Sequence, residues 1–130
     1  MHTNDNYNSC VDSIEKLKKQ FIQFAMDVAG LVTRLPANSV NFVYGNQVIR
    51  YSNYTSTNYR ATGRVNYQAD FICKLKTVKE AAEESVSFLE LLLFFNKEYK
   101  NDFDSLINEG NELLSITVSS IKNCKRLIFQ

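Results

Sequence analysis

Apolar residues in the first part of the chain recur every three or four positions, the spacing of one face of an amphipathic helix. This stripe consists of Val11, Ile14, Leu17, Phe21, Phe24, Val28, Leu31 and Leu35. Ala25, Ala29 and Val32 widen the face beyond the narrow seam of a coiled coil, as a helix in a globular bundle requires. Pro36 ends the predicted helix, because the residue before a proline avoids helical geometry.

The stretch from residue 38 to residue 63 allows two interpretations. By propensity, residues 41–51 form a β-hairpin that turns at Gly45 and Asn46. As a helix, the same region has a small and polar stripe, formed by Val48, Ser52, Thr55 and Tyr59. An isolated hairpin between long helices has no sheet to join and is only marginally stable. The helix is therefore favoured over the hairpin.

The third segment has two apolar stripes. One consists of Phe71, Leu75, Val78, Ala82, Val86, Leu89 and Leu93, and the other of Ile72, Phe88, Leu91 and Phe95. A helix with two apolar faces must bury both, so one face is expected to meet something beyond its own bundle.

The fourth segment is predicted to begin at about Asp102, a suitable N-cap residue. Its stripe runs through Phe103, Leu106, Gly110, Leu113, Thr117, Ile121, Cys124 and Ile128. Glycine weakens a helix by about 1 kcal/mol relative to alanine, so Gly110 is expected to permit the close approach of a neighbouring helix.

These four segments predict an all-α protein, an antiparallel up-down-up-down four-helix bundle. The connections are short, so each helix runs antiparallel to the one before it. Residues 1–9 are expected to form a flexible N-terminus, and residues 10–130 a single domain. A chain of 130 residues has enough core for such a domain without further cross-links.

The composition argues against several kinds of chemistry. Cys10, Cys73 and Cys124 are far apart, and His2 is the only histidine, so neither a zinc site nor a Cys-His or Ser-His arrangement is expected. No phosphate-cradling glycine loop is present. We therefore expect no enzyme activity, no cofactor, no metal and no small-molecule substrate. No apolar run is long enough to span a membrane, and the polar N-terminus does not resemble a signal peptide, so a cytoplasmic location is expected.

Charge is segregated along the chain although the net charge is only +1. From Arg34 to Lys79 there are seven basic residues and one acidic residue, whereas from Glu80 to Glu112 there are nine acidic residues and two lysines. Antiparallel packing would gather basic residues at one end of the bundle as a candidate surface for phosphates or an acidic partner. The candidate residues are Arg60, Arg64, Lys74, Lys76, Lys122, Lys125 and Arg126.

Four polar residues in the middle helices are interpreted as structural: Asn58, Tyr59, Glu83 and Glu84. Asn58 is expected to bond across a helix interface, on the row next to the stripe that contains Tyr59. Arg60 is expected to pair with Glu83 or Glu84 of the third helix.

Four stretches carry a family resemblance: TNYRA at 57–61, ADFICKL at 69–75, EAAEES at 80–85 and FLELL at 88–92. In order and spacing they resemble the bacterial four helix bundle protein family. Some members are encoded in intervening sequences of ribosomal RNA genes, and a relative is the accessory variability determinant of diversity-generating retroelements. The resemblance implies that residues 38–63 are a helix, that the protein forms a ring-shaped homopentamer, and that it has no catalytic residues.

Two functions follow from these observations. The first is a non-enzymatic oligomeric adaptor that binds RNA or a nucleic-acid-handling protein, such as a reverse transcriptase or a ribosomal component, through its basic end. The alternative is an oligomer with a purely structural or protein-interaction role. Salt-dependent binding to nucleic acid would separate the two.

Overall fold

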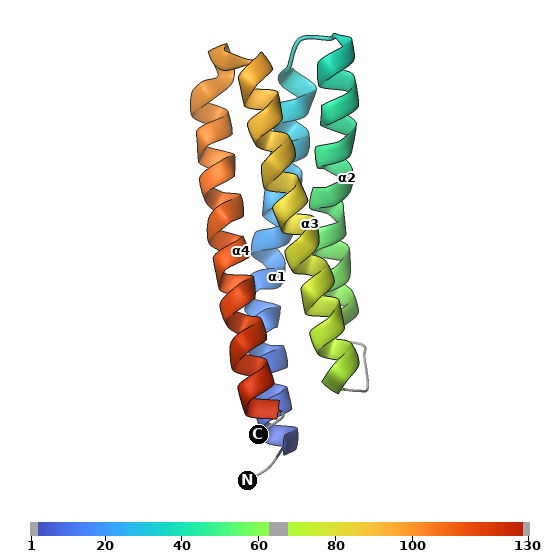
Figure 1. Ribbon diagram of the computed structural model, residues 1–130, viewed down its shortest axis with the longest axis vertical. Helices are drawn as coiled ribbons and strands as arrows, with labels where there is room; N and C mark the ends of the chain where they lie inside the picture. Colours follow the sequence, from blue (N-terminus) through green and yellow to red (C-terminus); the bar gives the residue numbers. More distant parts are fainter. Residues whose placement is uncertain (1–2, 63–67, 129–130) are drawn as a thin grey trace.

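The protein is a bundle of long helices (Figure 1). The computed structural model describes the backbone of residues 3–62 and 68–128, and the side chains of residues 15–57 and 70–126. Its helices are α1 (Thr3–Arg34), α2 (Ser39–Thr62), α3 (Gln68–Phe95) and α4 (Lys100–Ile128), with a 3₁₀ turn, η1 (Lys97–Tyr99), before α4. These ranges contain no strand.

Each helix runs antiparallel to the preceding one, and the start of α1 lies at the same end of the bundle as the end of α4 (Figure 1). The packed pairs are α1–α2, α2–α3, α3–α4 and α1–α4, which is the arrangement of an up-down-up-down bundle. The predicted all-α four-helix architecture is confirmed. None of the described helices combines the length and the apolar character needed to cross a bilayer.

Two predicted boundaries differ from the structure. The α1 helix begins at Thr3, so residues 3–9 are helical rather than a separate N-terminal segment. They contain neither glycine nor proline, and nothing in them stops a helix from extending. The α4 helix begins at Lys100, which places Asp102 in its first turn instead of at the N-cap. An acidic residue is favourable there because it faces the positive end of the helix dipole.

The predicted stripes form the core. The largest fully buried side chains include Phe21 and Phe24 of α1, Phe71 of α3 and Phe103 of α4. On α3, the first stripe is buried from Phe71 to Leu89, and Leu93 is partly buried. Cys124 is buried as a small apolar residue, whereas Cys73 is exposed.

Residues 41–51 are helical, so the hairpin interpretation is wrong. Val48, Ser52 and Thr55 are fully buried, as the helical stripe predicts. The two hydroxyl groups donate hydrogen bonds to carbonyl groups of their own helix, from Ser52 to Ile49 (3.1 Å) and from Thr55 to Ser52 (2.6 Å). Small, internally satisfied side chains let α2 lie close to its neighbours without burying an unpaired polar group.

Two helical glycines mark close contacts between helices. A Cβ atom at Gly110 would lie 2.9 Å from Cγ2 of Val86 and 3.2 Å from Cζ of Phe24, so the expected close approach at Gly110 is confirmed. A Cβ atom at Gly45 would lie 2.7 Å from Cγ1 of Val32. The absence of a side chain at Gly45 therefore brings α2 against α1, and this explains why a helix retains a residue that favours turns.

Candidate anion-binding cleft

Side chains of α3 and α4 form a cleft of about 300 Å³ near the basic end of the bundle. Its apolar lining consists of Val118 and Ile121, and its charged lining consists of Lys76, Lys79, Glu80, Lys122 and Lys125. On each helix these positions are separated by three or four residues, so each set lies on one face. Antiparallel packing then brings the start of α3 against the end of α4.

Lys76 and Lys125 approach each other across this cleft. The pKa of Lys125 is lowered first by a hydrogen-bonding contact with the Lys76 amine, then by the charge of Lys76, and last by desolvation. Lys79 forms an ion pair with Glu83 (3.6 Å). Among the described side chains, Lys76, Lys122 and Lys125 form no ion pair. An anion between the two crowded ammonium groups would relieve their repulsion.

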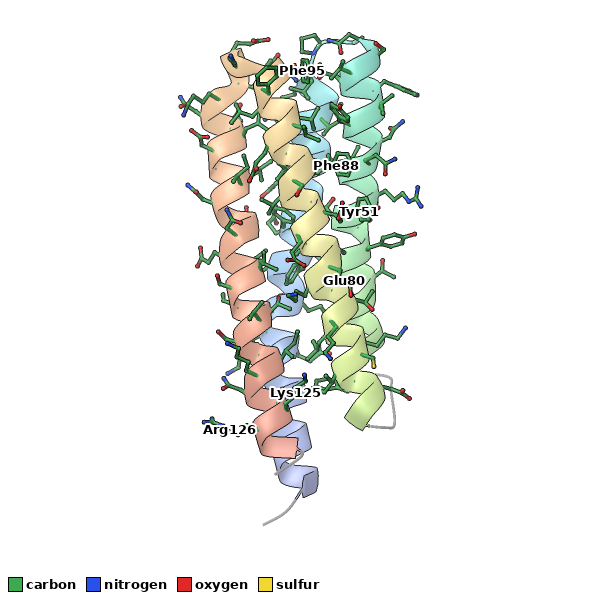
Figure 2. All side chains as sticks on the ribbon, in the orientation of Figure 1. Tyr51, Glu80, Phe88, Phe95, Lys125 and Arg126 are labelled. Atoms are coloured by element: carbon green, nitrogen blue, oxygen red, sulfur yellow. The ribbon has the colours of Figure 1, made fainter. Side chains whose placement is uncertain are left out.

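The predicted basic residues do not all share this cleft. Lys76, Lys122 and Lys125 come together there, and Lys79 joins them although it was not among the candidates. Lys74 lies on the other side of α3, because two positions along a helix turn it by about 200°. Arg126 projects outward from α4 beside Lys125 (Figure 2).

Four of the predicted residues lie outside the described side chains: Asn58, Tyr59, Arg60 and Arg64. The ring contacts of Tyr44 with Phe95 and of Tyr51 with Phe88 fix the register of α2 against α3. In that register position 60 is level with about position 79, roughly one turn from Glu83. Pairing of Arg60 with Glu83 or Glu84 stays a prediction, and Glu83 has Lys79 as a partner.

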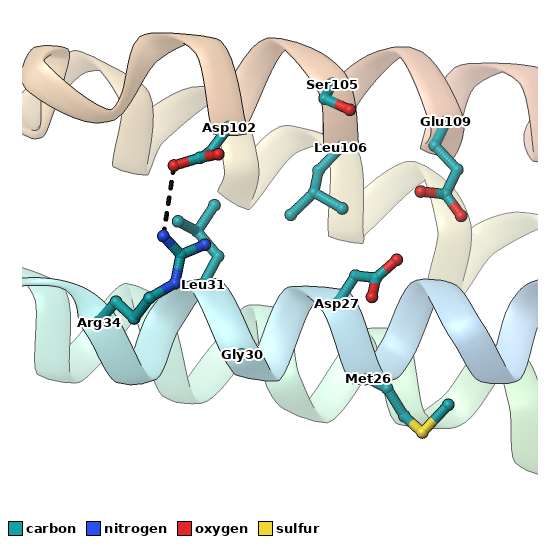
Figure 3. Close-up of a pocket in the computed structure, with 9 residues that line it drawn as sticks. All are labelled: Met26, Asp27, Gly30, Leu31, Arg34, Asp102, Ser105, Leu106 and Glu109. Carbon is teal, nitrogen blue, oxygen red and sulfur yellow. Dashed lines mark hydrogen bonds and ion pairs between the residues drawn. The ribbon is translucent and has the colours of Figure 1, made fainter.

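The opposite end of the bundle carries an acidic hollow between α1 and α4. This hollow has a volume of about 320 Å³, and Asp27, Asp102 and Glu109 are among the residues that line it. Figure 3 shows Arg34 reaching Asp102 (3.4 Å), while Asp27 faces Glu109. Burial raises the pKa of Glu109, and the charges of Asp27 and Glu112 raise it further. The Glu109 carboxyl group therefore holds a proton more tightly in the folded protein than in the unfolded protein. The protonated carboxyl group stabilises the fold at low pH, and this contribution is lost as the pH rises through the raised pKa.

Within the described ranges, no group of three or more histidine, cysteine, aspartate or glutamate residues is placed to hold a metal ion. The basic side chains of the lysine cleft offer charge recognition.

A second surface feature is a strip of aromatic rings along α2 and α3. Successive rings are in contact, with centroids 5.0–6.3 Å apart. The strip runs through Tyr54, Tyr51, Phe88, Tyr44, Phe95 and Phe94. It is the second apolar face expected for α3, extended by tyrosines of α2. Its Phe95 end lies at the end of the bundle opposite Lys125 (Figure 2).

This strip is only partly covered within the chain. Ile72 of the second α3 stripe is buried, whereas Leu91 is 41% exposed and Phe95 is 52% exposed. The neighbouring Phe94 is 65% exposed. Large apolar side chains grouped at one end of a surface are typical of a contact site for another protein.

Comparison with known proteins supports the fold. A solved structure from Bacteroides thetaiotaomicron, described as a protein of unknown function from the S23 ribosomal protein family, matches with a TM-score of 0.75. The sequence identity is 27%, and the match covers 82% of this chain and 98% of that chain. No protein-family model matches the sequence, and no curated protein does. The similarity therefore places the chain with this neighbour at the level of the fold.

Proposed function

We propose that this protein is a non-enzymatic oligomeric adaptor that binds RNA through the lysine cleft of α3 and α4. The observation that carries the proposal is the approach of Lys76 and Lys125 over a cleft that Lys79 and Lys122 also line. A phosphate group would bind between these lysines and release counterions from the nucleic acid. The neighbour's description as a member of a ribosomal protein family supports RNA as the source of the phosphates.

RNA binding is expected to depend on salt and only weakly on sequence. If several lysines contact phosphates, the affinity for RNA should fall roughly tenfold or more when the salt concentration is raised from about 50 to about 150 mM. No element of the cleft is built to read base edges, and the lysines contact the backbone, which is the same for every sequence. Fluorescence anisotropy with a labelled single-stranded RNA and with an RNA duplex measures both properties.

A charge-reversal pair tests the site itself. The double variant Lys76→Glu/Lys125→Glu should lose RNA binding while circular dichroism shows an unchanged fold, because exposed charges contribute little stability. The matched control is Lys97→Glu/Lys100→Glu, which changes the net charge equally at the opposite end. If both double variants weaken binding to the same extent, net charge rather than the cleft is responsible. Failure of the unmodified protein to bind RNA at low salt would reject RNA as the ligand and favour the structural alternative.

The adaptor is proposed to be a homo-oligomer, and the resemblance to the bacterial four helix bundle family gives the number five. The exposed ring of Phe94 and the exposed edge of Leu91 favour a contact between copies, since burying them removes apolar surface from water. Light scattering at micromolar concentration should give about five times the 15.0 kDa mass of one chain. Phe94→Asp should lower that mass without unfolding the helices, and a monomer for the unmodified protein would reject the oligomer.

A further inference from the structure

A second groove lies beside the lysine cleft around α3, and Glu80 lines both. It is formed by α2 and α3 and has a volume of about 410 Å³. Its lining consists of Tyr51, Tyr54, Thr77, Glu80, Ala81, Glu83 and Glu84. Figure 2 shows Tyr51 above Glu80 along this part of the bundle. The charged residues of this groove are thus three glutamates, whereas the adjoining cleft is lined mainly by lysine.

Two aromatic rings form the α2 wall of this groove. The rings of Tyr51 and Tyr54 meet edge to face, with centroids 6.2 Å apart and an interplanar angle of 74°. Tyr51 also stacks on Phe88 at 5.9 Å and 13°, which holds its ring in place. Tyr54 is 45% exposed, so part of its ring meets solvent. The negative face of an aromatic ring attracts a cation within about 6 Å of the ring centre.

The α3 wall of the groove carries three glutamates, and they line the same groove as the two tyrosines. Glu80 and Glu84 are one helical turn apart, and neither forms an ion pair with a described side chain. Glu83 is paired with Lys79. Ala81 lies between the glutamates and is buried, so a small side chain leaves space where a longer one would fill the groove. Carboxylates beside tyrosine rings form a site with both charge and shape for a flat cation.

We propose that this groove binds an arginine side chain presented by a cationic segment of a protein partner. A guanidinium group is planar, so it stacks on aromatic rings and donates paired hydrogen bonds to a carboxylate. A lysine ammonium group is a compact point charge and lacks this flat, forked geometry. The tyrosines would hold the plane of the guanidinium, and Glu84 would accept its hydrogen bonds. This inference extends the adaptor function by naming the class of its second partner, and it does not depend on RNA binding.

The test uses a short fluorescein-labelled Arg-Gly repeat peptide, with Lys-Gly and citrulline-Gly peptides of equal length for comparison. Anisotropy should show the arginine peptide binding several-fold more tightly than the lysine peptide, and no binding of the uncharged citrulline peptide. Tyr54→Leu and Glu84→Gln should each weaken the arginine peptide roughly three- to tenfold. Tyr54→Phe should retain the affinity, because it keeps the ring. RNA affinity of all three variants should remain that of the unmodified protein.

Matched controls separate this groove from general surface charge. Phe42→Leu removes another exposed aromatic ring of α2, and Glu112→Gln removes another exposed carboxylate, so neither should change peptide affinity. The proposal is overturned if the arginine and lysine peptides bind equally, or if Glu112→Gln weakens binding as much as Glu84→Gln. It is also overturned if Tyr54→Leu and Glu84→Gln change the oligomer mass in light scattering and leave peptide binding intact, because the groove would then be covered by a second copy.

Discussion

Replacing Leu89 by alanine should destabilise the protein by about 2–5 kcal/mol, because the change removes buried apolar surface and leaves a cavity in a tightly packed core. Leu89 lies in the middle of α3, its side chain is fully buried, and it belongs to the continuous apolar core of the bundle. Urea unfolding followed by circular dichroism measures the loss. In an oligomer, the comparison must be made at equal chain concentration, since assembly adds to the apparent stability.

Leu91 provides a control on the same helix with the same chemistry. It is two positions from Leu89 and 41% exposed, so Leu91→Ala should cost far less within one subunit. Two residues turn a helix by about 200°, which explains the difference between the two leucines. A loss below about 0.5 kcal/mol for Leu89→Ala would mean that the register of α3 is wrong. A large loss for Leu91→Ala that depends on chain concentration would indicate that another copy covers this face.

Helices α1, α3 and α4 could be predicted from the sequence because a continuous apolar stripe defines each of them. In α1, for example, the steps from Leu17 through Phe21 and Phe24 to Val28 all lead to buried side chains. Helix α2 is different because its buried face is built from Ser52 and Thr55, whose small polar side chains give no apolar period. Only their hydrogen bonds to their own backbone make them suitable for a helix interface. Local propensity alone therefore left the helix in competition with a hairpin.

The candidate site could be predicted in its position along the bundle and not in its position around it. Antiparallel topology is enough to bring Lys76 and Lys125 to the same end. Which basic residues share a cleft depends on the rotation of each helix, and this separates Lys74 from Lys76. Lys79 could have been found from its spacing of three residues from Lys76. Lys79 was not chosen because it lies at the boundary between the basic and acidic parts of the sequence, next to Glu80.

Two buried asparagines form a reciprocal amide contact that no sequence pattern indicated. Asn41 at the start of α2 and Asn96 at the end of α3 exchange amide hydrogen bonds of 3.0 Å and 2.7 Å. Asn41 also donates to the carbonyl of Pro36 (2.8 Å), and Asn96 donates to the carbonyl of Leu92 (2.8 Å). Both side chains are buried, with exposed fractions of 5% and 1%. Lone asparagines near helix ends usually read as caps, so a pairing across 55 positions is visible only in three dimensions.

This pair should act as a unit that ties the α1–α2 connection to the end of α3. Either single variant, Asn41→Ala or Asn96→Ala, leaves the partner amide buried with a missing hydrogen bond, and each should cost about 1–3 kcal/mol for that amide in addition to lost packing. The double variant removes both amides, so its cost should fall short of the sum of the single costs by about 1 kcal/mol or more. Urea unfolding of the four proteins completes the cycle. Additive costs would show that the two amides contribute independently, each through its own backbone carbonyl at Pro36 or Leu92, and that the exchange between them contributes no stability.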